Sequence, residues 1–321
     1  MRQMLIEPHS LPLARPFAIA RGTRTAVDVV RVTLSMQGKS GWGECTPTAH
    51  YQETVASVVE QLESVRAQVE GGASLDQVQA LLPPGAARNA VDCALWRLQA
   101  ALAGETLFQH MGVVLPESIV TAETLSLDSL DNMVLAAADA VSRGALLLKI
   151  KLNQHDVLPK VAAIREVAPE ASLIIDANEG WGDLALGPLF ESLSAYGIEM
   201  VEQPLPAGHD DGLADIVHPF PICADESCHG VKDIAGLKDR YDMINIKLDK
   251  CGGISEALAM VSTAQSQQMR VMVGCMLGSS LAMQAALPAA LQAEYVDLDG
   301  PIWLAEDCAP HLRYDRGRIW L

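Results

Sequence analysis

The feature that most constrains the fold is a regular alternation of apolar runs with amphipathic stretches from about residue 118 onward. The interval from Asp176 to Glu202 is 26 residues, and Asp225 and Lys247 follow after a further 23 and 22 residues. A strand, a helix and two loops fit within such an interval. The apolar runs lie at residues 119–122, 145–150, 172–175, 198–201, 221–224, 243–246, 271–274 and 295–298.

Eight such runs predict a (β/α) barrel at residues 116–321. An open, doubly wound sheet is the alternative, but the G-x-G-x-x-G fingerprint that would favour it is absent. The segment before the barrel, residues 1–115, has a different pattern, with strand-like runs first and helical patterns at 53–70 and 86–103. This order predicts a small α+β domain. The C-terminal segment of the barrel could return to that domain.

Composition excludes several classes of partner. A formal net charge of −17 argues against nucleic acid, which requires a basic face. The seven cysteines form no C-x-x-C pair, so we expect reduced thiols in a cytoplasmic protein. No signal peptide is recognisable, and no segment approaches the roughly 20 apolar residues of a membrane span.

Acidic residues end three successive predicted strands: Asp176, Glu202 and Asp225. In a barrel these side chains meet on one rim and repel one another unless a cation lies between them. Three carboxylates suit Mg²⁺, whereas the absence of His or Cys at equivalent positions argues against zinc. The alternative is that each acid caps the helix that follows it.

Lysines end two further strands. Lys149 and Lys151 point to the same side of the second strand, so we expect one of their pKa values to fall and to yield a neutral amine. Lys247 ends the sixth strand, roughly opposite. A substrate between Lys151 and Lys247 could lose an α-proton on one face, form a metal-stabilised enediolate, and regain a proton on the other face. A solvated strand end is the alternative for the K-x-K pair.

Five motifs in this order resemble the muconate-lactonizing subgroup of the enolase superfamily: K-x-K at 149–151, D-A-N at 176–178, E-Q-P at 202–204, A-D-E-S at 224–227 and K-L-D-K-x-G-G at 247–253. The resemblance covers essentially the whole chain. It implies a (β/α)7β TIM-like barrel with an N-terminal α+β capping domain. It also implies one Mg²⁺ per subunit, replaceable by Mn²⁺, on Asp176, Glu202 and Asp225. The acid/base residues would be Lys151 and Lys247, with Lys149 tuning Lys151.

Within the subgroup, IARGTR at 19–24, GCML at 274–277 and DLDG at 297–300 are similar to the L-Ala-D/L-Glu epimerases. That similarity implies an isomerase of murein peptide recycling that converts L-Ala-D-Glu to L-Ala-L-Glu. Asp297 and Asp299 would hold the dipeptide's ammonium group, and Arg24 would bind the glutamate side chain. A solvated turn is the alternative for the two aspartates. His50 and Tyr51 lie in a loop that could close over the site, and a homo-oligomer is possible.

Several other functions remain open. A cycloisomerase, an o-succinylbenzoate synthase and an N-acylamino acid racemase share the fold and the lysines, but their substrates lack the ammonium group. A Schiff-base aldolase using Lys247 would not need the three carboxylates. A non-catalytic barrel would not need to keep the full set of lysines and acids.

Overall fold

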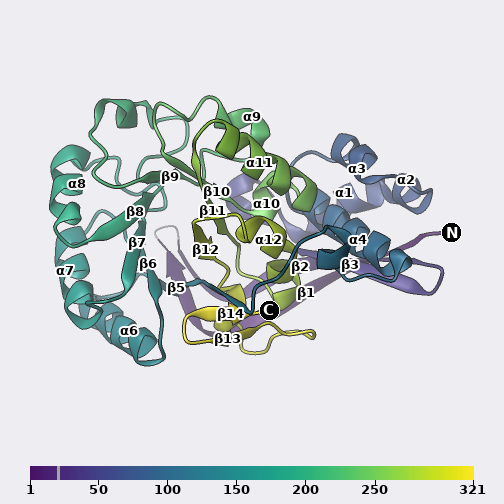
Figure 1. Cartoon of the computed structure of the whole chain (residues 1–321), viewed down its shortest axis with the longest axis horizontal. Helices are drawn as coiled ribbons and strands as arrows, with labels where there is room; N and C mark the ends of the chain where they lie inside the picture. Colours follow the sequence, from purple (N-terminus) through teal and green to yellow (C-terminus); the bar gives the residue numbers. More distant parts are fainter. Residues whose placement is uncertain (20–21) are drawn as a thin grey trace.

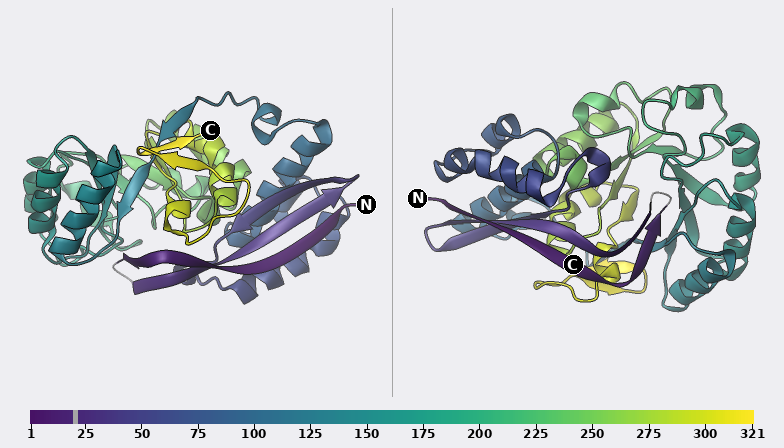
Figure 2. Two further views of the ribbon diagram at one scale, coloured as in Figure 1. Left: turned by 90° about the horizontal axis from the view of Figure 1, so that it is seen from below. Right: turned by 180° about the vertical axis from the view of Figure 1, so that it is seen from behind.

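The structure is a computed structural model that describes residues 1–19 and 22–321. Ala20 and Arg21 of the predicted IARGTR motif lie outside the described residues. The chain begins with an antiparallel sheet in the order β1 (Gln3–Ile19), β2 (Gly22–Met36) and β3 (Lys39–Cys45). Val30, Val32 and Leu34 alternate along β2 and are fully buried, as the period of two in this segment predicts. Figure 2 shows β1 and β2 reaching from this first domain to the barrel.

Helices cover one face of this sheet. They are η1 (Ala49–Tyr51), α1 (Val55–Ser64), α2 (Arg66–Glu70), α3 (Leu75–Leu81), α4 (Ala86–Ala103) and α5 (Leu107–His110). The single helical stretch predicted at 53–70 is therefore two helices that meet at Val65. Helix α4 packs so closely on β3 that a Cβ at Gly41 would lie 2.2 Å from the backbone nitrogen of Leu98. A larger residue at Gly41 would push the helix away.

The second domain is a barrel of eight parallel strands in chain order (Figure 1). Its first and last strands are joined by side chains, because Thr121 Oγ1 accepts from Leu298 N at 3.0 Å and Asp299 Oδ2 accepts from Thr124 N at 2.8 Å. The predicted barrel is therefore confirmed, and the open sheet is wrong. The strands are β5 (Ala122–Leu125), β6 (Leu147–Lys151), β7 (Ser172–Asp176), β8 (Ile198–Glu202), β9 (Ile222–Ala224), β10 (Met243–Ile246), β11 (Arg270–Gly274) and β12 (Tyr295–Asp297).

Helical segments separate the strands and cover the outside of the barrel (Figure 1). The inside is filled by one side chain from nearly every strand, among them Ile174, Met200 and Met272, all fully buried. This layer of side chains closes the barrel interior beneath the C-terminal rim. The helical segments are α6 (Leu130–Ser142), α7 (Val157–Val167), α8 (Leu186–Ser194), η2 (Asp211–Asp215), α9 (Val231–Ile234), α10 (Leu248–Cys251), α11 (Ile254–Ser266), α12 (Ser280–Ala290) and η3 (Gly300–Trp303).

One predicted strand was misplaced. The run 119–122 was expected to be the first barrel strand, but β4 (Ser118–Val120) pairs antiparallel with β14 (Arg318–Trp320), which in turn pairs with β13 (Arg313–Asp315). The chain end takes Ser118–Val120 into a separate sheet, so the barrel begins at Ala122, three residues after the predicted start.

The segment after β12 also contacts the first domain. Leu304 forms an antiparallel bridge with Leu13, and Ala305 N donates to the carbonyl of Pro12 at 2.9 Å. Within the part of the chain that is described, no helix is long and apolar enough to cross a membrane.

Candidate active site

The three acids singled out from the sequence meet at the C-terminal rim of the barrel. Asp176 and Glu202 are the last residues of β7 and β8, and Asp225 directly follows β9. All three are buried, and each offers an oxygen within 4.8 Å of the others. None of them is the residue that caps the next helical segment, so the capping alternative is wrong.

The three lysines singled out from the sequence contact these acids. Lys151 Nζ donates to Asp176 Oδ2 at 2.5 Å, and Lys247 Nζ donates to Asp225 Oδ2 at 2.5 Å. Lys149 Nζ lies 2.6 Å from Glu202 Oε2 and 3.1 Å from Asp176 Oδ2. The lysines are thus buried against carboxylates, which contradicts a solvated strand end.

The expected fall of a lysine pKa is wrong for Lys149. Burial lowers the pKa of this ammonium group, but the carboxylates of Asp297, Glu202 and Asp176 offset burial and hold the pKa well above its usual value. The pKa of Lys247 is also raised, because Asp225 and Glu202 outweigh its burial. Crowded acids dominate here over the proximity of two ammonium groups, on which the sequence argument relied.

A cavity of about 500 Å³ opens above this cluster. This volume is in the range typical of small-ligand sites. Lys151 and Lys247 line it from the barrel, and Arg24 lines it from the first domain, two residues into β2. The structure therefore brings the predicted lysines, Arg24, Asp297 and Asp299 to one cavity, while Asp176 and Glu202 lie beneath its wall.

Asp297 and Asp299 differ in what they offer to this cavity. Both are buried, at 5% and 4% exposure, so neither belongs to a solvated turn. Asp299 Oδ2 accepts from Thr124 N at 2.8 Å and from Trp303 Nε1 at 3.2 Å. Its pKa is raised to about 6 by burial and by Asp297. Asp297 Oδ2 accepts from Lys149 at 2.8 Å, whereas its Oδ1 has no hydrogen-bond partner among the described residues.

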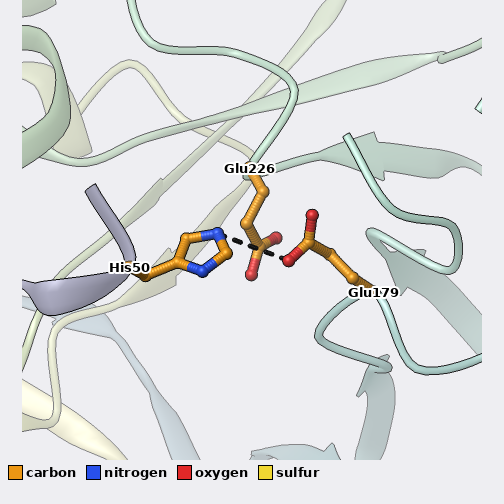
Figure 3. Close-up of side chains that lie close together, drawn as sticks. All are labelled: His50, Glu179 and Glu226. Atoms are coloured by element: carbon orange, nitrogen blue, oxygen red, sulfur yellow. Dashed lines mark ion pairs between the residues drawn. The ribbon is translucent and has the colours of Figure 1, made fainter. Parts of the chain in front are cut away.

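A second group of side chains, drawn from both domains, lies close together (Figure 3). His50 Nε2, from η1, lies 3.3 Å from Glu179 Oε2, in the loop after β7. Glu226, after β9, places an oxygen within 4.8 Å of both. The neighbouring Tyr51 ring meets the ring of His229 edge-on at 4.7 Å. His50 and Tyr51 line the cavity, so their loop does lie over the site.

Two contributors were not recognised from the sequence. Lys250 Nζ donates to Asp225 Oδ1 at 2.6 Å, and Asn245 Nδ2 donates to Glu202 Oε1 at 2.7 Å. Asn245 interrupts an apolar run two residues before Lys247, so the alternation used for the K-x-K pair could have identified it. Lys250 lies in the short helix α10, where strand alternation carries no information.

Comparisons with known families agree with this architecture. Residues 132–321 match the enolase C-terminal domain-like family, and residues 1–112 match the N-terminal domain of mandelate racemase and muconate lactonizing enzyme. The chain therefore belongs to the mandelate racemase/muconate lactonizing enzyme family of the enolase superfamily.

Individual relatives narrow this class. The chain is 46% identical over 321 residues to the L-Ala-D/L-Glu epimerase of Escherichia coli strain K12, covering 100% of both chains. It is 39% identical over 281 residues to the N-acetyl-D-glutamate racemase of Pseudoalteromonas sp., covering 87% of this chain and 88% of the relative.

Solved structures of dipeptide epimerases and their homologues are also similar. An enolase family member from Agrobacterium tumefaciens with homology to dipeptide epimerases, solved with sodium and L-Ala-L-Glu, has a TM-score of 0.96 at 44% identity, covering 100% of this chain and 98% of that one. A dipeptide epimerase from Enterococcus faecalis V583, solved with Mg and L-Leu-L-Tyr, has a TM-score of 0.90 at 29% identity, covering 99% and 96%.

Proposed function

We propose that this protein is a dipeptide epimerase that inverts the α-carbon of the C-terminal residue, with L-Ala-D-Glu and L-Ala-L-Glu as the substrate pair. The observation that carries the proposal is the placement of Lys151 and Lys247. They reach one cavity from the second and sixth barrel strands, and each is paired with a different carboxylate. Two acid/base groups on opposite sides of one carbon allow removal of a proton from one face and delivery to the other.

A divalent cation fits the residues beneath this cavity. Asp176, Glu202 and Asp225 offer only oxygen ligands, and buried carboxylates this close require positive charge among them. We propose Mg²⁺, as in the Enterococcus faecalis structure, and expect Mn²⁺ to substitute. A bound cation would supply the positive charge that stabilises the substrate's carboxylate as its α-proton leaves.

The charges of the site support an anionic substrate. Four buried carboxylates pair with four buried ammonium groups, so these ion pairs are close to neutral by themselves. A divalent cation would add two positive charges. A substrate carboxylate would add one negative charge, and the conversion of one lysine to its neutral amine would remove one positive charge. Together these two changes would balance the charge of the cation. The groups counted are Asp176, Glu202, Asp225 and Asp297 against Lys149, Lys151, Lys247 and Lys250.

The three lysines would have different roles. Lys151 and Lys247 would exchange the proton with the substrate. Lys149 shares Asp176 Oδ2 with Lys151, so it would tune Lys151 through their common acceptor. Being held by Asp297, Glu202 and Asp176 together, Lys149 is poorly placed to move a proton itself.

Substrate selection would rest on cavity-lining groups from both domains. The buried Oδ1 of Asp297 would accept a hydrogen bond from the dipeptide's ammonium group, and the guanidinium of Arg24 would pair with the glutamate side chain. An L-Ala-D-Glu substrate would place the reaction in the recycling of murein peptides.

A deuterium-exchange experiment tests this function. The protein is incubated with Mg²⁺ in D₂O together with L-Ala-D-Glu, other dipeptides and N-acetyl-D-glutamate, and mass spectrometry follows deuterium at the α-carbon. We expect rapid uptake and epimerisation for L-Ala-D-Glu, loss of activity in excess chelator, and recovery with Mg²⁺ or Mn²⁺. Preferential turnover of N-acetyl-D-glutamate would instead favour an N-acylamino acid racemase. Full activity in chelator would favour a Schiff-base mechanism.

A further inference from the structure

The three acids beneath the cavity share one pattern. Each has one oxygen held by a donor from the surrounding protein rather than by Lys149, Lys151 or Lys247. The bonds are Asn178 N to Asp176 Oδ1 at 2.9 Å, Asn245 Nδ2 to Glu202 Oε1 at 2.7 Å and Lys250 Nζ to Asp225 Oδ1 at 2.6 Å.

The remaining oxygen of each acid faces lysines that line the cavity. Asp176 Oδ2 and Asp225 Oδ2 are bonded to Lys151 and Lys247, and Glu202 Oε2 lies 2.6 Å from Lys149. A cation that enters from the cavity therefore meets the three carboxylate oxygens that contact these lysines. The oxygens on the far side stay bonded to the protein.

The outer donors have little freedom to leave. Lys250 is 2% exposed, and its ammonium group has three acceptors: the carbonyl of Asp225 at 2.5 Å, Asp225 Oδ1 at 2.6 Å and the carbonyl of Asn245 at 3.0 Å. All three of its protons are thus engaged. The Asn245 amide packs against Gly274, where a Cβ would lie 2.8 Å from Asn245 Oδ1. Neither side chain lines the cavity.

We propose that Asn245 and Lys250 are positioning residues that make the site selective for a small divalent cation, by restricting Glu202 and Asp225 to one ligand oxygen each. Mg²⁺ takes six ligands at short, nearly octahedral distances, which three single oxygens plus water and substrate satisfy. Ca²⁺ takes six to eight oxygens and commonly uses both oxygens of a carboxylate. The inference rests on the proposed metal site.

Isothermal titration calorimetry with Mg²⁺ and Ca²⁺ on the whole protein, without substrate, tests the inference. We expect Asn245→Ala and Lys250→Met to weaken Mg²⁺ binding by roughly 10- to 100-fold, the usual effect of removing a group that orients a ligand. Ca²⁺ binding should weaken less, because the freed carboxylate oxygens become available to Ca²⁺. The Kd for Ca²⁺ divided by the Kd for Mg²⁺ should therefore fall by about tenfold.

Lys160→Met is the matched control, because Lys160 is also a buried lysine but lies on α7, away from the three acids. It should leave the ratio unchanged. Asn245→Ala removes no charge, so it keeps the test valid if Lys250→Met fails to fold. An unchanged ratio in a folded Asn245→Ala variant would overturn the inference while leaving the epimerase function intact. A wild-type protein that binds neither ion would instead refute the metal site itself.

Discussion

The barrel rim and the first domain both build the cavity, but they hold their side chains differently. On the rim, Lys151 and Lys247 lie at the ends of strands in one continuous sheet. Each lysine contacts a buried acid whose other oxygen accepts a second hydrogen bond from the surrounding protein. The first domain contributes Arg24 near the tip of a hairpin and His50 on a single turn of helix. From this difference we expect that the barrel rim carries the reacting groups and holds the dipeptide's ammonium group, whereas the first domain selects the second side chain.

The first domain is also bonded to the barrel at a distance from the cavity. Helix α4 is bonded to the barrel, because Asn89 Nδ2 donates to Asp249 Oδ1 at 2.8 Å and Ser255 Oγ donates to Asp92 Oδ1 at 2.6 Å. The domain is thus anchored along α4, while its cavity-lining residues lie at β1–β2 and η1. Substitutions at these two places should change substrate preference without changing the chemistry, unlike substitutions of the rim lysines.

The largest effect is expected from the rim lysines. Lys151→Ala and Lys247→Ala should each lower the rate of epimerisation in both directions by roughly 10²- to 10⁴-fold, the usual contribution of a general acid or base. Each variant should still exchange the α-proton of one epimer with D₂O, through the lysine that remains. Proton NMR of both epimers measures the exchange. Near wild-type epimerisation in either variant would contradict the two-base assignment.

Asp297→Asn should have the next largest effect. It keeps the side chain's shape but removes the negative charge that would pair with the dipeptide's ammonium group. Loss of such a charge-assisted hydrogen bond costs about 1.5–3 kcal/mol, or roughly a 10- to 100-fold loss in kcat/KM for L-Ala-L-Glu. Steady-state kinetics with L-Ala-L-Glu and its N-acetyl derivative provide the measurement. If wild-type protein used both substrates equally well, Asp297 would have no role in ammonium binding.

The sequence predicted the rim better than its surroundings. Asp176, Glu202 and Lys247 were found because a charged residue that ends an apolar strand of a barrel must point to the C-terminal rim. The same local argument failed for the run 119–122, since its pairing partner, β14, lies at the other end of the chain. Long-range pairing of this kind leaves no local periodicity to detect.

Electrostatics were predicted less well than positions. The sequence placed Lys149 beside Lys151 correctly, but the pKa of Lys149 depends on acids from three other strands, including Asp297 at 2.8 Å. Lys250 was missed for a related reason, because its role depends on contact with Asp225 and not on its own position in a pattern. A pattern identifies which residues reach the rim, whereas their charges depend on the whole set of neighbours.

Arg24→Met should have a smaller and more selective effect than either rim change. Arg24 is exposed on β2 and lines the cavity, so its loss should not disturb the barrel. We expect kcat/KM for L-Ala-L-Glu to fall by about tenfold, the equivalent of one charge-assisted bond of about 1.4 kcal/mol. An uncharged dipeptide should be nearly unaffected. Equal losses for both dipeptides would show that Arg24 supports the cavity and does not read the second side chain.

The smallest effect is expected at His50, where the first domain touches the barrel loops. His50 lies 3.3 Å from Glu179 and is partly exposed, and an exposed pair of this kind contributes about 0.2–1 kcal/mol. His50→Ala should therefore raise KM for L-Ala-L-Glu by roughly two- to fivefold and leave kcat nearly unchanged. His155→Ala, which removes an exposed histidine from the loop after β6, is the control and should change neither constant. A large fall in kcat for His50→Ala alone would mean that this contact helps to position the reacting groups, and that the first domain takes part in the chemistry after all.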